Sequence, residues 1–567
     1  MVHVATAAET CANCNADTTV RPRWCDENAG TGMGDSMSIS RRAALGSGLA
    51  FAAAPSILRA QPRPSAARTV RAIIQGDIAT YDPIWTTANT AAYHGAMVYD
   101  TLFGLDANFK SQPQMVDKFG VSDDQLTWTF QLRDGLKFSD GTPVTTADVI
   151  PSIKRWAARS GSGQLLMLRV ASLDAKDEKT FFVKLKEPFP LIIEIFGNTT
   201  TPLLYIMRKK EAETDPMQKI DTFVGSGPFI FNQQETKPGS QYVYDKNPNY
   251  VPRQDPATGI AGGKVVKVDR AIMMAVPDSQ TAIAALQSGE VDMVELPPID
   301  FLDQLASDPN IVLADLFKLG TVGYTGLNWL HPPFNNQKIR QAMLYIQKQD
   351  DMLRPTFVSE KYYKTCGSWF TCGSPMANDA NTEWFKHGQD FEKARQLMKE
   401  GGYDGRPVVV LQATSMEYMR NAATVLADAM RRAGFNVDLQ PMDWANVVQR
   451  RASKAPPEQG GWNIFFTSAG GLSQSNPYMV TNMACTGDKA WFGWPSDEPY
   501  EQLRNNWIRA GSEDERKKIA SEIQARAWEI VPHLYYGQWN QPVAHRKNVQ
   551  GWLPVPEIIP FWNVTKT

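Results

Sequence analysis

The sequence predicts an α/β protein, because strand-like and helix-like segments alternate along most of its length. Two strand–helix–strand units carry this prediction. In the first, a helix over residues 281–287 joins strands at 268–276 and 291–294. In the second, a helix over residues 417–432 joins strands at 408–411 and 435–440. Units of this kind place their strands parallel in one sheet. The length of 567 residues is enough for about three or four domains.

Composition is that of an ordinary globular protein and excludes a nucleic-acid partner. Hydrophobic residues make up 43% and charged residues 21% of the chain, and the net charge is −2. This balance lacks the basic surface that nucleic-acid binding requires. The chain has 16 tryptophans. Each either packs in the hydrophobic core or lines a ligand cleft, and its position must decide between these two roles.

The first 60 residues are expected to precede the folded protein. Residues 1–36 show no helical or strand period, and the lone Cys11–Cys14 pair lacks the second pair of a metal site. They are interpreted as a disordered leader or a misassigned start. In residues 37–60, Ser40-Arg41-Arg42 before an apolar run resembles a twin-arginine export signal, with cleavage near Ala60. No cysteine follows that site, so a lipid anchor is not indicated.

Residues 127–149 predict a strand, two turns and the start of a helix. Trp128, Phe130 and Leu132 alternate with polar residues, as in a half-buried strand. The Asp-Gly pairs at 134–135 and 140–141 are turn signals. Thr145 and Asp148 have the spacing of a capping box at a helix start. Pro151 falls in the second helical turn, so the helix is expected to begin later or to kink there.

The same stretch carries a family resemblance. TFQLRDGLKFSDGTPVTTADV (residues 129–149) resembles the hallmark segment of the family 5 solute-binding proteins, the extracytoplasmic dipeptide, oligopeptide and nickel receptors of ABC importers. Four further segments are similar and occur in the family's order: VGSGPFIF (224–231), LQSGEVDM (286–293), PPFNNQKIRQAMLYI (332–346) and KARQLMKEGGY (393–403). A phosphate-binding loop is the alternative for 224–231, but it lacks the lysine and the following helix.

The resemblance implies a two-lobed periplasmic-binding-protein fold (type II, oligopeptide-binding-protein-like) with an extra subdomain in the first lobe. Lobe I would span residues 69–316, including an inserted subdomain at about 105–219, and lobe II residues 317–530. Residues 531–567 would return to lobe I, with hinges near 316–323 and 530–537. The expected protein is a soluble periplasmic monomer that delivers its solute to an ABC permease.

No motif in the chain predicts catalysis, a cofactor or a metal. HExxH, a nucleophile elbow, a Walker loop and paired cysteine ligands are all absent from the sequence. The six histidines are scattered, and only His94 and His331 fall near predicted cleft segments. An exported hydrolase on a similar scaffold stays as a lesser alternative.

Candidate ligand contacts follow from the rule that ligands sit beyond the carboxyl ends of parallel strands. Trp444 follows the strand ending at Gln440, and Ser468, Ala469, Gly470 and Gly471 follow the strand ending at Thr467. Trp329 closes the strand that begins at Tyr324, so these segments are expected to converge on one crevice. Trp491 and Trp494, in a loop-like stretch, are further candidates. Simple packing is the alternative for each tryptophan.

Cys366 and Cys372 are expected to form a disulfide, with two buried thiols as the alternative and Cys485 left unpaired. The bridge would fix the loop that carries Trp369 and Phe370. The family resemblance places this loop beside the ligand.

One departure from the family bears on the ligand. Members that bind peptides carry an Asp shortly after the strand matching Trp462–Thr467, where it pairs with the ligand's α-ammonium. Here the window reads SAGGLSQSNPY and holds no carboxylate. Either another acid serves, or the ligand has no free amine there. A sugar, an opine-like conjugate or a metal chelate therefore stays open beside peptides.

Overall fold

The computed structural model describes residues 65–478, 481–555 and 557–567. The predicted leader and export signal, residues 1–36 and 37–60, lie outside the described residues. The α/β prediction is confirmed, because helices alternate with strands that form mixed sheets. No helix in the described ranges combines the length and apolar character needed to cross a membrane.

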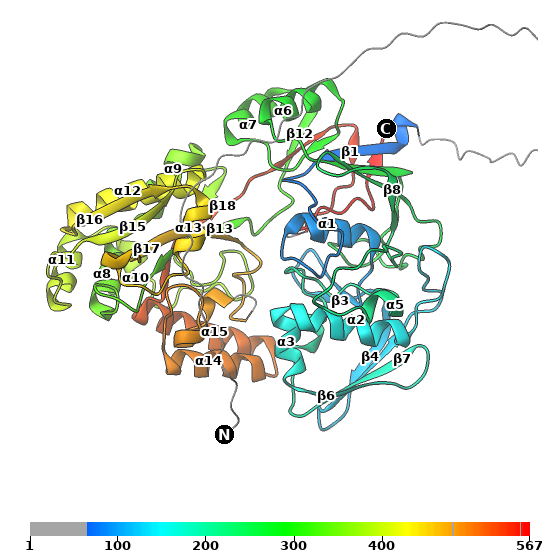
Figure 1. The fold of residues 1–567 in the computed structure, drawn as a ribbon, viewed down its shortest axis with the longest axis horizontal. Helices are drawn as coiled ribbons and strands as arrows, with labels where there is room; N and C mark the ends of the chain where they lie inside the picture. Colours follow the sequence, from blue (N-terminus) through cyan, green and yellow to red (C-terminus); the bar gives the residue numbers. More distant parts are fainter. Residues whose placement is uncertain (1–64, 479–480, 556) are drawn as a thin grey trace, which may run out of the picture. The chain divides into compact units, whose positions relative to one another are not determined.

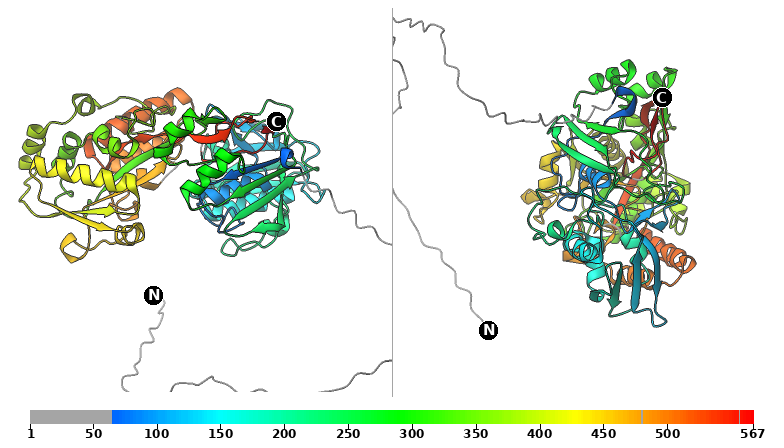
Figure 2. Two further views of the ribbon diagram at one scale, coloured as in Figure 1. Left: turned by 90° about the horizontal axis from the view of Figure 1, so that it is seen from above. Right: turned by 90° about the vertical axis from the view of Figure 1, so that its right-hand side faces the viewer.

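The first sheet joins strands from both ends of the described chain. Its order is β12 (Ile311–Ala314), β19 (Val543–Arg546), β11 (Met293–Val294), β1 (Thr69–Ile73), β10 (Arg270–Met274), β9 (Gln241–Lys246) and β8 (Phe229–Lys237). Strand β1 and the C-terminal residues lie side by side (Figure 1, Figure 2), and Lys566 Nζ donates to the carbonyl of Thr69 at 3.1 Å.

The first predicted strand–helix–strand unit is present, with one strand interposed. Helix α6 (Ser279–Ser288) connects β10 to β11, and both strands run parallel to β1, which lies between them. Asp278 caps α6 by accepting from the N–H of Thr281, and Gly289 ends it in the left-handed conformation. Asp292 and Glu295, on either side of β11, both accept from backbone N–H groups of the β1 region.

The second sheet is built almost entirely from the middle of the chain. Its order is β14 (Tyr363–Lys364), β18 (His533–Trp539), β13 (Thr321–Leu327), β17 (Ile464–Gly470), β15 (Val408–Ala413) and β16 (Val437–Met442). Helix α12 (Glu417–Ala433) joins β15 to β16, which pair in parallel as predicted and lie beside it in Figure 1. Strand β13 is antiparallel to both of its neighbours.

A third sheet lies within residues 116–185, between β1 and β8 in the chain. Its order is β4 (Val116–Val121), β5 (Thr127–Leu132), β7 (Thr180–Leu185) and β6 (Val170–Ala175). Helix α2 (Thr146–Arg159) follows β5 in the chain. The predicted capping box is present at its start, with the Thr145 N–H donating to Asp148 Oδ2 at 2.9 Å. The expectation of a later start was wrong, since α2 begins at Thr146 and includes Pro151.

The remaining helices cover these sheets or join their strands. They are α1 (Asn89–Val98), α3 (Gly161–Met167), α4 (Ile192–Phe196), α5 (Lys209–Ala212), α7 (Leu302–Ser307), α8 (Gln337–Ile346), α9 (Gln349–Phe357), α10 (Glu383–His387), α11 (Phe391–Glu400), α13 (Trp444–Arg450), α14 (Glu498–Arg509) and α15 (Glu513–Ile530). Two short strand pairs complete the described strands: β2 (Phe103–Leu105) with β3 (Ser111–Pro113), and β20 (Val549–Gln550) with β21 (Thr565–Lys566).

The chain passes between the first and second sheets at two places. Residues 315–320 connect β12 to β13, and residues 540–542 connect β18 to β19. The first connection overlaps the expected crossing near residue 316. The second comes later than the expected return at 531, because residues 533–539 form β18 and pair with β13 inside the second sheet.

Candidate functional site

A cavity of about 330 Å³ lies where the ends of the first and second sheets face each other. The first-sheet side contributes Gln75, which follows β1, Glu295, which follows β11, and Asn89 and Tyr93 of α1. The second-sheet side contributes residues from β13, α12, β17 and β18. These are Thr321, Tyr418, Ser468, Ala469, Gly470 and Trp539. A volume in this range accommodates a small-molecule or short-peptide ligand.

Strand direction explains why these residues meet. Strands β1 and β11 are parallel, so the residues that follow them emerge at the same edge of the first sheet. In the second sheet, β15, β16 and β17 run parallel, while β13 is antiparallel to β17, with Thr321 opposite Gly470. The start of β13 and the end of β17 therefore share the edge that faces the cavity.

Three of the four predicted residues at the end of β17 line the cavity. They are Ser468, Ala469 and Gly470, and the Ser468 hydroxyl lies 3.3 Å from that of Tyr418. Gly471 comes next and donates its N–H to the Gly320 carbonyl at 2.7 Å. A Cβ at position 471 would lie 2.1 Å from the Leu319 carbonyl oxygen, so only glycine permits this close backbone approach.

The predicted convergence of Trp329 with this turn is wrong. Because β13 is antiparallel to β17, the residue that follows β13 emerges at the opposite edge of the sheet. Trp329 packs there against the Arg340 guanidinium, whose central carbon lies 3.4 Å from the ring centroid, and its indole N–H donates to Pro532. Its role in this structure is packing.

Trp444, Trp491 and Trp494 also lie outside the cavity lining. Trp444 and Trp491 are half-buried, and the Arg451 guanidinium lies 5.2 Å from each ring. Trp494 is buried, with its ring centroid 6.0 Å from that of Trp462. The packing alternative describes all three in this structure.

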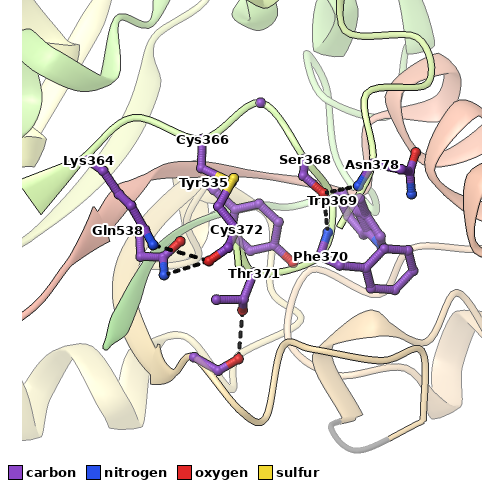
Figure 3. Close-up of a disulfide and its surroundings, with 12 residues drawn as sticks. Lys364, Cys366, Ser368, Trp369, Phe370, Thr371, Cys372, Asn378, Tyr535 and Gln538 are labelled. Atoms are coloured by element: carbon purple, nitrogen blue, oxygen red, sulfur yellow. Dashed lines mark hydrogen bonds between the residues drawn. A yellow bond between two sulfur atoms is a disulfide. The ribbon is translucent and has the colours of Figure 1, made fainter. Parts of the chain in front are cut away.

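The predicted disulfide between Cys366 and Cys372 is present, and Cys485 is a free, buried thiol, as expected (Figure 3). The loop between the bridged cysteines does not present its aromatic rings to the cavity. Trp369 and Phe370 are both 0% exposed, and the space that they border has a volume of only about 10 Å³. That is room for one water at most. They are core residues in this structure and do not line the cavity at the sheet ends.

The disulfide loop instead supports the turn that lines the cavity. The Thr371 hydroxyl donates to the Gly471 carbonyl at 2.6 Å, and the Thr371 N–H donates to Gln474. Gln538 Nε2 donates to Leu319 at 2.8 Å and to Cys372 at 3.2 Å, the second of which Figure 3 shows. The bridge thus fixes residues that hold the Gly470–Gly471 turn in place.

Glu295 is a buried acid at the cavity that has no cationic partner among the described residues. It is 1% exposed and accepts from the Gln75 N–H at 2.6 Å, from Gln75 Nε2 at 2.9 Å and from the Tyr93 hydroxyl. Burial raises the pKa of Glu295 to about 7, although these hydrogen bonds act in the opposite direction. Burial and the neighbouring Glu295 carboxylate together raise the pKa of Tyr93 well above its ordinary value.

Glu557 supplies a second carboxylate from the C-terminal segment. Burial raises its pKa to about 7, and the Glu557 charge contributes to the raised pKa of Tyr93. A Cβ at position 470 would lie 1.8 Å from Glu557 Oε1, so this carboxylate rests on the backbone of Gly470. The two acids therefore approach the cavity from Tyr93 on one side and from the end of β17 on the other.

Sequence reasoning missed both acids. A signal existed for Glu295, because the predicted strand at residues 291–294 ends immediately before it and the carboxyl-end rule applies there too. For Glu557 the sequence offers no periodicity or motif, and its place depends on how the chain returns after β18.

Strand β17 leaves one side partly open beside the cavity. It pairs with β13 along its whole length, from Ile464 to Gly470, but pairs with β15 only at Ile464. Residues 465–470 thus have no strand partner on the β15 side among the described residues. Ser468, Ala469 and Gly470 are the part of this edge that lines the cavity, and their backbone can pair with an extended main chain.

A second cavity of about 390 Å³ adjoins the first, since Leu472 lines both. It lies between α4 and the loop after β2 on one side and α14 and α15 on the other. An ion pair bridges these sides, with Arg516 Nη1 3.1 Å from Glu194 Oε1. The space available to a solute therefore extends beyond the cavity at the sheet ends.

The two histidines singled out from the sequence do not line either cavity. His94 is buried with Nδ1 3.0 Å from the Tyr244 hydroxyl, and burial lowers its pKa to about 3. His331 Nε2 lies 2.9 Å from the Lys454 carbonyl. In the part of the chain that the structure describes, no three metal-ligating side chains are grouped.

Comparison with known proteins matches this geometry to a family. The model of the bacterial extracellular solute-binding proteins, family 5 Middle, matches residues 110–491. A "Probable peptide ABC transporter periplasmic-binding protein" of Sinorhizobium fredii is 42% identical, and the alignment covers 94% of this chain and 100% of that protein.

Two solved structures share the fold. One, from A. tumefaciens R10, is the binding protein AgaA in complex with agropinic acid, at a TM-score of 0.71 and 22% identity, over 88% of this chain and 99% of that one. The other, DppA from Helicobacter pylori in complex with the peptide STSA, has a TM-score of 0.69 and 20% identity, over 88% and 98%. One fold thus holds chemically different solutes, and the fold alone does not select among them.

Proposed function

The chain belongs to the bacterial extracellular solute-binding proteins of family 5, and we propose that it captures peptides or peptide-like solutes for an ABC importer. The cavity at the carboxyl ends of β1, β11 and β17 would hold the solute. Its 42% identical relative bears a name that specifies peptide transport. The proposed role is binding rather than catalysis.

The open side of β17 is the observation that favours a peptide. An extended peptide main chain added beside Ser468, Ala469 and Gly470, which line the cavity, would pair with backbone groups that β15 does not reach. Tyr418 and Trp539, whose ring centroids are 5.1 Å apart, would wall the same edge. Main-chain pairing gives affinity without reading side chains, which suits capture of varied peptides.

Two connections would serve as the hinge between lobes. The first sheet and the 116–185 insert would form one lobe, and the second sheet with its helices would form the other. Residues 315–320 and 540–542 are the segments that must bend, since each joins a strand of one sheet to a strand of the other. Solute bound between the lobes would favour the closed form, which would dock on a membrane permease.

The proposed setting is the periplasm, reached through the twin-arginine-like signal at residues 37–60. There the protein would act as a monomer that collects solute ahead of the permease. An oxidising compartment also suits the Cys366–Cys372 bridge.

Thermal unfolding of the purified protein against a solute panel tests the proposal. The panel contains free peptides of two to five residues, the same peptides N-acetylated, sugars and nickel chelates. A solute that binds only the folded state at 100 times its Kd stabilises that state by about 2.7 kcal/mol. We expect the melting temperature to rise with peptides. A rise with sugars or chelates alone would refute a peptide receptor.

A further inference from the structure

Four charged side chains line the second cavity, and they meet as two pairs of opposite sign. Glu194 of α4 and Lys110, in the turn between β2 and β3, lie on one side. Arg516 and Glu513, both in the first turn of α15, lie on the other. Arg516 Nη1 is 3.1 Å from Glu194 Oε1, and Lys110 Nζ is 3.7 Å from Glu513 Oε2. Each side therefore offers one cation and one anion, and each charge faces its opposite.

These ion pairs connect segments that belong to different sheets. Lys110 and Glu194 lie in the chain between β1 and β8 of the first sheet, whereas α15 lies between β17 and β18 of the second. Among the ion pairs of the described residues, these two join the proposed lobes, and the others lie within one lobe. Movement of one lobe relative to the other would therefore act directly on both pairs.

Arg516 is held in position before Glu194 reaches it. Its side chain is only 15% exposed, and its guanidinium carbon lies 5.8 Å from the ring centroid of Trp507 on α14. Among the described residues, Glu194 is the group that accepts a hydrogen bond from this guanidinium. Because the planar head is already oriented by its own lobe, the Arg516–Glu194 pair forms with little loss of side-chain entropy.

The second pair is the looser one. Lys110 is 66% exposed, and it shares Glu513 with Lys517 of the same helix, whose Nζ lies 2.8 Å from Glu513 Oε1. An exposed ion pair contributes little when one partner already has another counter-ion. The Arg516–Glu194 pair should therefore carry most of the effect.

Both pairs lie far from the connections about which the lobes would turn. Leu319 and Asn540, one from each connection, line the first cavity, whereas the four charges line the second, and Leu472 borders both. Figure 1 shows β12, which leads into the first connection, near the top of the view and α15 toward the bottom. A rotation about the connections moves the most distant points furthest. Opening would therefore separate these charges.

We propose that the Arg516–Glu194 and Lys110–Glu513 pairs form an electrostatic latch that holds the two lobes closed over a bound solute. This inference rests on the proposed function, because it takes the lobes to close on a solute in the first cavity. A contact made only in the closed form shifts the open–closed equilibrium toward closure, so it raises the apparent affinity without touching the solute. The latch therefore contributes equally to every solute that permits closure.

Dependence on salt distinguishes the latch from packing between the lobes. Glu194 is 47% exposed, so dissolved ions reach the Arg516–Glu194 pair. Salt screens charges beyond about 10 Å at 0.1 M and beyond about 3 Å at 1 M. Release of a bound peptide should accelerate with salt more steeply in the wild type than in a variant that lacks the pair. Charges on the peptide respond to salt alike in both proteins, so the comparison isolates the latch.

The test measures how fast the full chain releases a pool of free tetrapeptides. The loaded protein is diluted into about 0.1 M or about 1 M NaCl, and the peptide that stays bound after gel filtration is quantified by mass spectrometry over time. Glu194→Gln should release peptide about threefold faster than the wild type at the lower salt, and the difference should disappear at the higher salt. Glu529→Gln is the matched control and should behave as the wild type. Glu529 is 53% exposed and pairs with Arg526 at 2.8 Å on the same helix α15, within one lobe.

Exchange of the two charges tests whether Glu194 and Arg516 act as a pair. Glu194→Arg alone brings two guanidinium groups together and should accelerate release about tenfold, and adding Arg516→Glu should restore the wild-type rate. Melting temperatures establish that each variant is folded.

Two results would overturn the latch and leave the peptide receptor standing. One is release from Glu194→Gln at the wild-type rate, and the other is a faster release from Glu194→Arg that the added Arg516→Glu does not restore. Retention of no peptide at all by the wild type would overturn both the latch and the proposed function.

Discussion

The buried carboxylate of Glu295 should make the stability of the free protein depend on pH in a defined direction. This side chain is 1% exposed and has no cation beside it in the part of the chain that the structure describes, and burial raises its pKa to about 7 from an ordinary 4.5. The folded state therefore binds the Glu295 proton more tightly than the unfolded state does. The stabilising contribution of that proton is complete below about pH 4.5 and is lost as the pH rises through 7.

The magnitude follows from the size of the shift. A change in pKa of this size corresponds to about 3 kcal/mol between the two limits. For cooperative unfolding of about 500 residues, that is roughly 3 °C in melting temperature. The Glu295→Gln variant lacks the titrating group, so its melting temperature should fall less than the wild-type value between pH 5 and pH 8.

Differential scanning calorimetry of the wild type, Glu295→Gln and Glu290→Gln, without solute, measures this difference. Glu290 is exposed, so its variant should follow the wild type at every pH. The Gln side chain cannot accept at both of its terminal atoms, so Glu295→Gln starts from a lower melting temperature at pH 5, and only the change with pH is diagnostic. Parallel curves for the wild type and Glu295→Gln would refute the account of Glu295 as a destabilised, cation-free acid.

Three further substitutions test separate parts of the structure. Replacing Cys366 and Cys372 together by Ser should lower the free energy of unfolding by roughly 2 kcal/mol, measured by urea unfolding, and a midpoint equal to the wild-type value would contradict a stabilising bridge. Gly471→Ala places a Cβ 2.1 Å from the Leu319 carbonyl and should weaken peptide binding in calorimetric titration, whereas Gly511→Ala, with open space around it, should not. Equal affinities for the two alanine variants would show that the turn tolerates a side chain. Trp329→Leu should lower the free energy of unfolding by roughly 2 kcal/mol and leave peptide affinity unchanged, because Trp329 packs on Arg340 at the far edge of the sheet. A large loss of peptide affinity in this variant would show that Trp329 contributes to binding after all.

Much of the fold was predictable because the local signals agreed with the tertiary structure. The parallel pairs around α6 and α12 follow from their strand–helix–strand patterns, and the capping box at Thr145 marks the start of α2 to the residue. Pro151 suggested a later start for α2 than the structure shows. A helix whose first turn is well capped can lose one backbone hydrogen bond and continue. The return to the first sheet was placed too early because nothing local marks residues 533–539 as belonging to β13's sheet.

The site was less predictable, and the reason is strand direction. The carboxyl-end rule placed Ser468, Ala469 and Gly470 at a crevice, and they line the cavity because β17 is parallel to β15. The same rule misplaced Trp329, because the sequence does not reveal that β13 is antiparallel to its neighbours. The number of tryptophans did not indicate where the ligand cleft lies, because large aromatic rings stabilise a core as readily as they line a cleft. Trp369, for example, is a core residue.

Gly470 lines the cavity, but the sequence indicated only part of the reason for a glycine there. From the sequence, the glycines after β17 were expected to leave backbone groups open to a ligand. In the structure, the missing side chain at 470 also makes room for the Glu557 carboxylate, which arrives from the C-terminal segment. The sequence window after β17 holds no acid, and two alternatives were open: another acid serves, or the solute has no free amine. The Glu557 carboxylate now lies against that window from elsewhere in the chain, and a side chain at position 470 would have to displace it.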